Sequence, residues 1–174
     1  LCLLRYRFTY NGIVYIAEED KVTEVTSYSE HQLPLERADI SDSMKKQTEE
    51  QKRRLKSGEI PIASHTVMVV DQSGSMKNAD VFGHRTRSRA AYYVIASEII
   101  GKQLHYDLCS SRDVVTLIDM RDSEVQIVVD KEPISWELYN YFVGLAEDPL
   151  RPRGHGYFKP ALSKAIASLL STDN

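Results

Sequence analysis

The sequence predicts a three-layer α/β domain, with helices on both faces of a largely parallel sheet and a β-rich extension in front. Short apolar runs at 67–70 and 114–118 have the composition of strands buried on both faces. Between and after them, apolar residues recur every three or four positions, as in helices that pack on a sheet. The order strand, helix, strand, edge strand and helix is the opening half of a doubly wound sheet.

The composition of the 174-residue chain fits one main domain with an appendage. It is 42% hydrophobic, and a net charge of −3 with a pI near 6.0 gives no general attraction to nucleic acid or anionic membrane. No apolar run approaches the roughly 20 residues that cross a bilayer. Cys2 and Cys109 have no metal or disulfide-scaffold spacing. We expect an intracellular, cytoplasmic protein without nucleic-acid partners, and interpret the start without Met as processing or truncation.

A small β-meander is predicted for residues 1–28. Polar and apolar residues alternate over 4–10, Asn11-Gly12 is a strong hairpin turn, and 13–16 forms the return strand. A charged turn leads to a third strand at 22–28. We interpret the tyrosines of these strands as packing residues, because aromatic side chains are common in strands.

A charged helix is predicted from Pro34 to Gly58, with Ser41 as a possible cap inside it and Gly58 as its stop. Glutamates interrupt its basic residues, which favours a solvated helix with charge pairs between turns over a nucleic-acid surface. A linker follows, so we place a domain boundary near residue 60. Residues 1–60 then form the extension and 61–174 the main domain.

The segment from His65 to Met76 organises the rest of the chain. Its apolar run ends on Asp71, and Ser73, Gly74 and Ser75 turn the chain towards a helix. A carboxylate and two hydroxyls therefore meet at the carboxyl end of a strand, where open α/β sheets bind their ligands. Such hard oxygen donors suit Mg²⁺, Mn²⁺ or Ca²⁺ and do not suit Zn²⁺ or copper.

The run Asp-Gln-Ser-Gly-Ser-Met at 71–76 resembles the Asp-x-Ser-Gly-Ser-Met signature of von Willebrand factor type A domains, relatives of the integrin inserted domain with a Rossmann-like sheet. In that family the loop is the first part of a metal-ion-dependent adhesion site. The resemblance implies a divalent cation, Mg²⁺ before Mn²⁺ or Ca²⁺, held by Asp71, Ser73 and Ser75. The order of elements resembles the family over roughly residues 64 to 170.

A polar loop at 77–84 and a helix at 85–104 follow. Four helix residues at helical spacing are predicted to pack on the sheet: Ala91, Val94, Ile95 and Ile99. Three arginines stand at the helix start, where its dipole disfavours cations: Arg85, Arg87 and Arg89. Solvation and contact with acidic groups of a partner are equal alternatives for them.

A second buried strand is predicted at 113–120, a hairpin at 121–123 and a half-exposed edge strand at 124–130. A helix then starts at Pro133. Its aromatic and aliphatic residues recur at helical spacing, which favours a core role over a binding surface.

The segment Leu150–Leu162 partly resembles the family's second metal loop. That loop usually contains Gly-Gly-Thr-Asn, three variable residues and a small-apolar pair that opens a helix. Aligning Ala161-Leu162 with that pair puts Gly156 where the family keeps its metal-binding Thr, with His155 beside it. Neither replaces a hydroxyl well, although water can fill a Mg²⁺ coordination position.

The family's third metal element, an Asp after a later strand, has no counterpart before Asn174. A sheet that ended beside a strand buried on both faces would leave an unpaired apolar edge. We therefore expect that the domain is incomplete at its C-terminus, or that the first 30 residues or a partner cover this edge.

The leading hypothesis is a non-catalytic protein–protein interaction module, whose metal takes an acidic group from a protein partner within a larger polypeptide or complex. The alternatives are a scaffold with a degenerate metal site and a regulatory module of a larger enzyme. Catalysis by this segment is disfavoured. An aspartyl-nucleophile phosphatase would need a second Asp where Ser73 stands, and neither a hydrolase elbow nor a phosphate loop is present.

Overall fold

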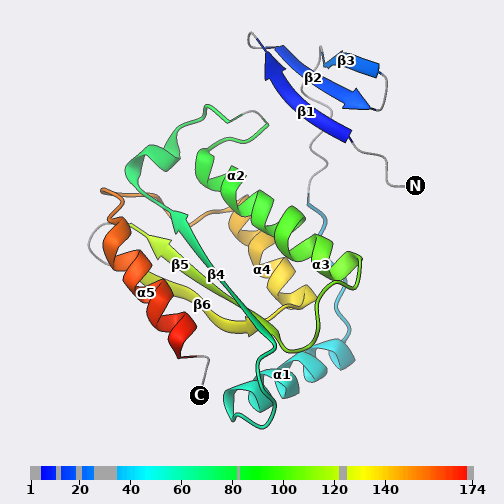
Figure 1. Cartoon of the computed structure of the whole chain (residues 1–174), viewed down its shortest axis with the longest axis vertical. Helices are drawn as coiled ribbons and strands as arrows, with labels where there is room; N and C mark the ends of the chain where they lie inside the picture. The colour runs from blue at the N-terminus through cyan, green and yellow to red at the C-terminus, as the bar shows by residue number, and fades with distance from the viewer. Residues whose placement is uncertain are drawn as a thin grey trace. The chain divides into compact units, whose positions relative to one another are not determined.

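A computed structural model of the chain describes residues 5–10, 13–18, 21–25, 35–81, 83–121 and 125–171 (Figure 1). The chain divides into two compact units, Leu1–Pro34 and Leu35–Asn174. In the first unit, three strands form an antiparallel sheet of order β1-β2-β3: β1 (Arg5–Tyr10), β2 (Ile13–Glu18) and β3 (Lys21–Val25). The predicted meander is confirmed, while its Asn11-Gly12 turn lies outside the described residues.

The second unit is built on a sheet of order β4-β5-β6. Strand β4 (Ser64–Asp71) is parallel to β5 (Asp113–Met120), and β5 is antiparallel to β6 (Gln126–Pro133). A parallel pair needs a long crossover. Three consecutive helical segments supply it: α2 (Arg87–Val94), the π-helix η2 (Ile95–Gly101) and α3 (Lys102–His105).

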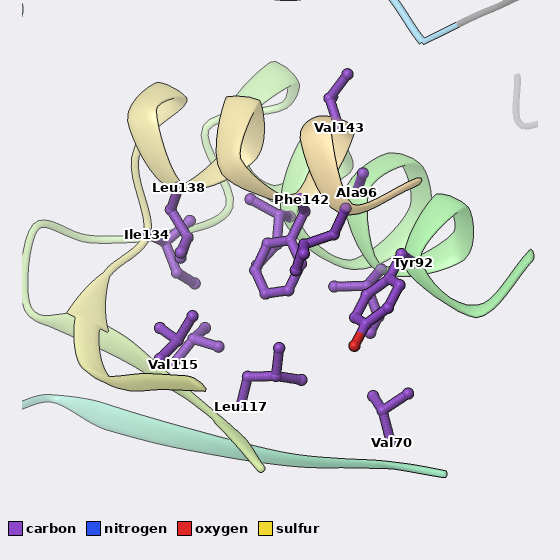
Figure 2. Close-up of a cluster of buried hydrophobic side chains, with 13 residues drawn as sticks. Val70, Tyr92, Ala96, Val115, Leu117, Ile134, Leu138, Phe142 and Val143 are labelled. Atoms are coloured by element: carbon purple, nitrogen blue, oxygen red, sulfur yellow. The ribbon is translucent and has the colours of Figure 1, made fainter. Parts of the chain in front are cut away.

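Helices cover both faces of this sheet, so the predicted α/β layering is confirmed. The crossover helices and α4 (Trp136–Glu147) cover one face, and α5 (Phe158–Leu170) covers the other (Figure 1). The main core lies on the first face, where Phe142 and Leu117 are fully buried (Figure 2). No described helix combines the length and apolarity needed to span a membrane.

Helix α1 (Asp42–Lys56) begins later than predicted, directly after Ser41. The Ser41 hydroxyl accepts a hydrogen bond from the Met44 N–H at 3.2 Å, so the possible internal cap is the true helix start. The segment before it is held out of the helix, because the Asn140 amide bonds both the N–H and the C=O of Ala38. Gly58 ends the helix with a φ of +71°, as predicted.

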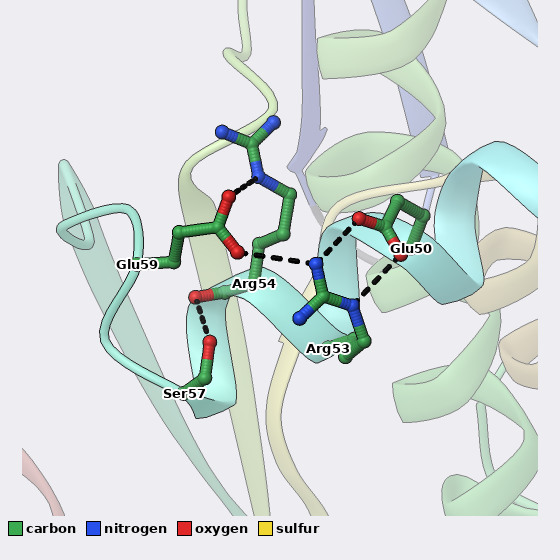
Figure 3. Close-up of polar contacts among 5 residues, drawn as sticks. All are labelled: Glu50, Arg53, Arg54, Ser57 and Glu59. Atoms are coloured by element: carbon green, nitrogen blue, oxygen red, sulfur yellow. Dashed lines mark hydrogen bonds and ion pairs between the residues drawn. The ribbon is translucent and has the colours of Figure 1, made fainter.

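Charged side chains on α1 pair with one another and with Glu59, just after the helix, which confirms the predicted charge-paired helix (Figure 3). Arg53 contacts Glu50 at 2.7 Å and Glu59 at 3.1 Å, and Arg54 contacts Glu59 at 2.7 Å. These pairs are exposed to solvent, so each adds little to stability. Within α1, they satisfy basic residues that would otherwise suggest a nucleic-acid surface.

The domain boundary lies between Pro34 and Leu35 and not near residue 60. The physical reason is that α1 packs against strand β6 of the second unit. Leu55 is buried, and Lys52 reaches Glu132 on β6 at 2.8 Å. Helical periodicity alone does not show which sheet a helix will cover.

Two burial predictions need correction. Val67 to Val70 were expected to be buried on both faces, but Val69 is 36% exposed and only Val70 is buried, because β4 is an edge strand of the described sheet. Val94 was expected in the core but is 47% exposed. The prediction is confirmed for Ile95, which is buried, and for Ala91 and Ile99, which pack against the core. Tyr92, Ala96 and Ile100 complete the buried stripe.

Strand β5 matches its prediction at both ends, and β6 is an antiparallel edge strand as expected. Two of the three residues of the predicted hairpin at 121–123, Asp122 and Ser123, lie outside the described part, as does Glu124 at the start of the predicted edge strand. Pro133 ends β6 and does not start a helix. Helix α4 begins after Ser135, whose hydroxyl accepts a hydrogen bond from the Leu138 N–H at 3.2 Å.

Candidate metal site at the carboxyl end of β4

The first loop of the site starts on Asp71, the last residue of β4. Asp71 Oδ1 accepts a hydrogen bond from the Ser73 N–H at 2.8 Å, which turns the chain back over the strand end. The hydroxyls of Ser73 and Ser75 then lie 3.2 Å apart. A short 3₁₀ helix, η1 (Gly74–Lys77), follows Ser73 and fixes this spacing. The loop therefore gathers one carboxylate and two hydroxyls.

The second loop, which leads into α5, is hydrogen-bonded to the first. The Arg153 N–H donates to the Gln72 carbonyl at 2.9 Å, and the Gly74 N–H donates to the Gly154 carbonyl at 2.9 Å. Gly154 has a φ of +65°, a conformation that glycine adopts without strain. These bonds hold the two loops against each other, although they lie about eighty positions apart in the sequence.

Gly156 lies directly against the carboxylate of Asp71. A Cβ added at Gly156 would lie 3.2 Å from Asp71 Oδ1 and 3.6 Å from the Cβ of Ser73. The second loop thus offers only backbone at this point, and His155, the preceding residue, is exposed. Ser73 is buried and Ser75 exposed, so the hydroxyl pair runs from the interior to the surface.

Sequence reasoning missed Asp119, the penultimate residue of β5. Its register partner is Val70, one residue before Asp71, so parallel pairing brings both carboxylates to the same end of the sheet. The Asp119 side chain is fully buried and pairs with Arg121, Nη2 to Oδ2, at 2.8 Å. The available signal was a charged residue inside an otherwise apolar strand, beside a strand that ends in Asp.

The electrostatics of Asp119 connect it to the loop residues. Burial raises the pKa of Asp119, Arg121 and Arg153 oppose that rise, and the charge of Asp71 adds to it. Tyr92 is buried nearby, and its pKa is raised by burial first and by Asp119 second. Its hydroxyl points towards the sheet (Figure 2). Asp71 and Asp119 thus belong to one electrostatic cluster.

The arginines at the start of α2 were left between solvation and partner contact. Arg87 lies against its own chain, because its guanidinium Nε donates to Asp80 Oδ1 at 2.7 Å in the preceding loop. This pair lowers the pKa of Asp80 through the hydrogen bond. Arg85 is exposed. Arg87 is therefore held in an internal ion pair, and solvation and partner contact remain equal alternatives for Arg85 and Arg89.

The donor chemistry fits a hard divalent cation. Asp71, Ser73 and Ser75 offer oxygen atoms only, and nearby Asp119 carries carboxylate oxygens without a hydrogen bond in the described part of the chain. In that same part, no three His, Cys, Asp or Glu side chains are placed to hold a metal ion. The donor set at the end of β4 thus combines acidic and hydroxyl oxygens.

Comparison with known proteins gives limited similarity. No protein-family model matches the sequence, and no curated protein matches it. Among solved structures, the chain is similar to the von Willebrand factor type A domain of SpRpn10, with a TM-score of 0.43 and 15% identity. That match covers 62% of this chain and 51% of the other, so the similarity spans about half of that domain's chain.

Proposed function

We propose that this chain is a non-catalytic protein–protein interaction module of the von Willebrand factor type A kind, which binds an acidic group of a protein partner through a divalent cation. Asp71, Ser73 and Ser75 would hold the cation, with Mg²⁺ preferred and Mn²⁺ or Ca²⁺ as alternatives. One observation carries the proposal. The Ser73 and Ser75 hydroxyls lie 3.2 Å apart. The loop that carries them is held to the Asp71 carboxylate by the hydrogen bond from the Ser73 N–H.

The chemistry of the loop residues suits this role. Asp71 supplies the negative charge that draws a cation to the loop, and the two hydroxyls are neutral ligands. A hard cation held by few charges stays electrophilic enough to take a further carboxylate oxygen. Gly156 adds no side chain to this donor set, so the cation would keep positions for water or for a partner's carboxylate.

An intracellular location belongs to this proposal. Cys109 carries a free thiol, and burial raises its pKa, which lowers its reactivity at neutral pH. A half-buried free thiol is common in proteins of reducing compartments. Attachment of the module to a larger polypeptide or complex is part of the same proposal.

A scaffold with a degenerate metal site is the second candidate. The observation that favours it is the pair of arginines around Asp119, because Arg121 and Arg153 already place positive charge next to the acidic cluster. An internal cation can replace a metal ion as the counter-charge of a carboxylate. In that case the fold would serve as a binding surface, or as a regulatory module of a larger enzyme, without metal.

Calorimetric titration with Mn²⁺ separates these candidates. We expect the wild-type chain to bind one Mn²⁺, the Ser73→Ala plus Ser75→Ala variant to lose that binding, and Ser111→Ala to retain it. Ser111 is an exposed serine remote in sequence from both loops. Glutarate, a small dicarboxylate, then tests the acidic-group step and should bind only the Mn²⁺-loaded protein. Equal Mn²⁺ binding by wild type and double variant would contradict the proposed ligands.

A further inference from the structure

Asp119 is a buried charge whose hydrogen-bonding capacity is unused. Its side chain is 0% exposed, and within the described part of the chain neither carboxylate oxygen has a hydrogen-bond partner. Its contact with Arg121 Nη2 is an ion pair without hydrogen-bond geometry, and this pair is made by Oδ2 and not by Oδ1. Buried carboxylates are normally both paired and hydrogen-bonded, because an uncompensated buried charge is costly.

Arg121 does not complete this pairing. An arginine that serves one carboxylate usually donates two parallel hydrogen bonds to it. Here Arg121 Nη2 also donates to Gln126 Oε1 at 3.0 Å, and its Nε has no hydrogen-bond partner among the described residues. The guanidinium is therefore divided between two groups and leaves Asp119 partly uncompensated.

The position of Asp119 connects this unused charge with the loop. It sits one register step from the Asp71 end of β4, and the charge of Asp71 adds to the rise in the pKa of Asp119 that burial causes. Two further buried polar atoms are found nearby: Gln72 Nε2 on the first loop and the Tyr92 hydroxyl on α2. Neither has a hydrogen-bond partner among the described residues. Gln72 belongs to the loop itself, and its Oε1 accepts from Ser88 of α2 at 2.8 Å.

We propose that Asp119 is the second carboxylate of the cation site, with Arg121 as the internal counter-ion that competes with the bound cation for it. This inference rests on the proposed function, because it concerns the same site. The negative charge of Asp119 adds to that of Asp71 and raises cation affinity. Arg121 holds Asp119 in the cation-free protein, and its positive charge opposes cation binding. Asp119 therefore acts as a positioning and charge-supplying residue behind Asp71, Ser73 and Ser75.

The test compares the Mn²⁺ affinities of two variants that both carry the substitution Arg121→Gln. The variant Arg121→Gln removes the competing charge, and Arg121→Gln plus Asp119→Asn removes both members of the pair, so no unpaired buried charge remains. Groups behind the direct ligands change metal affinity by about 10- to 100-fold. We expect Arg121→Gln to bind Mn²⁺ more tightly than wild type, and the double variant to bind about 10-fold or more weakly than Arg121→Gln.

Asp130→Asn is the matched control, because it removes one exposed carboxylate from the neighbouring strand β6. Its Mn²⁺ affinity should equal that of wild type. Thermal unfolding in EDTA reports folding separately from binding, and the double variant should unfold in a single cooperative transition. If that variant fails to fold, Arg121→Gln alone decides, since unchanged or weaker Mn²⁺ binding by it would overturn the inference.

Mn²⁺ binding by the wild-type chain distinguishes a missing cation site from a cation site to which Asp119 does not contribute. A wild-type chain that binds no Mn²⁺ would contradict the proposed function and, with it, the role of Asp119. A wild-type chain that binds Mn²⁺, with equal affinities for Arg121→Gln and the double variant, would overturn the inference about Asp119 alone. Tighter Mn²⁺ binding by Arg121→Gln than by wild type, together with weaker binding by the double variant than by Arg121→Gln, would support it.

Discussion

The two faces of the β4-β5-β6 sheet are covered in different ways. On the face under α2, η2 and α4, large side chains such as Tyr92, Leu117 and Phe142 are fully buried in a continuous cluster (Figure 2). On the face under α5, the buried cluster is small: Ile118, Val125, Ala161 and Ala165. The first face therefore contributes most of the hydrophobic stabilisation, since this scales with the apolar area buried.

Hydrogen bonds replace part of the packing on the α5 face. His65 Nε2 lies 2.8 Å from the Thr116 hydroxyl, and the Ser168 hydroxyl lies 3.5 Å from it. Lys131 Nζ donates to Ser171 at the end of α5 at 2.9 Å. The outer surface of α5 and its first turn exposes a set of large apolar side chains: Tyr157, Phe158, Leu162, Ile166, Leu169 and Leu170.

This difference bears on the candidate site. Asp71 is the last residue of β4 and Asp119 the penultimate residue of β5, and both strands pack against the main core. Gly154 and Gly156 lie on the loop that leads into α5, which covers the smaller buried cluster. The first half of the site is thus fixed by the core, and the second half depends on a few loop hydrogen bonds. We expect substitutions in the core under α4 to lower the stability of the whole unit, and substitutions under α5 to lower it less.

The largest effect is expected for Phe142→Ala on the α4 face. Phe142 is 0% exposed, and removing a buried phenyl ring costs about 3–5 kcal/mol because a cavity remains. Urea unfolding of the chain measures the loss. A cost below about 1 kcal/mol would show that the α4 face is not the main source of stability.

A smaller effect is expected for Ile118→Ala on the α5 face, even though Ile118 is also 0% exposed. The neighbouring residues Ala161 and Ala165 are small, so α5 can shift towards the sheet and reduce the cavity. We expect about 2 kcal/mol, the lower end of the range for this substitution. A loss equal to that of Phe142→Ala would remove the distinction between the two faces.

Acidification should weaken the α5 face through His65. Burial lowers the pKa of His65 below its usual value, with Lys131 adding to the effect. The unfolded chain then binds more protons than the native one, so stability is full above the usual His range and falls as the pH drops through it. Between pH 8 and pH 5.5, the urea midpoint of wild type should fall further than that of His65→Gln. Equal falls would exclude His65 as the cause.

The smallest effect is expected for Leu162→Ser on the outer surface of α5. Leu162 is 50% exposed, and surface substitutions away from special features usually change stability by less than about 0.5 kcal/mol. The urea midpoint should therefore remain close to wild type. A loss of 2 kcal/mol or more would mean that this surface is covered in the folded protein.

The sequence predicted features whose causes are local. The strand at 113–120 was placed correctly because its apolar run is bounded on both sides, and Ser41 and Gly58 were recognised from cap chemistry alone. Features that depend on tertiary neighbours were not predicted. The segment before α1 is held out of the helix by hydrogen bonds between Ala38 and Asn140, which lies 102 positions later in the sequence. The exposure of Val94 follows from which side of the helix meets the sheet.

The candidate site likewise contains residues that the sequence alone could identify and one residue that it could not. Asp71, Ser73 and Ser75 stand within five positions, so their composition could be interpreted directly from the sequence. Asp119 reaches the site only through the pairing of β4 with β5, and its burial against Arg121 depends on both strands. A charged residue in an apolar strand is ambiguous in sequence, because it marks either a strand end or a buried functional group.

Thermal unfolding of the wild-type chain in EDTA and in Mg²⁺ or Mn²⁺ tests the metal site most directly. A cation present at 100 times its dissociation constant should add about 2.7 kcal/mol to the free energy of unfolding. We predict an upward shift of the melting temperature that the Ser73→Ala plus Ser75→Ala variant does not show. Identical melting of the wild-type chain in EDTA and in saturating Mg²⁺, Mn²⁺ and Ca²⁺ would contradict a functional cation site at the end of β4.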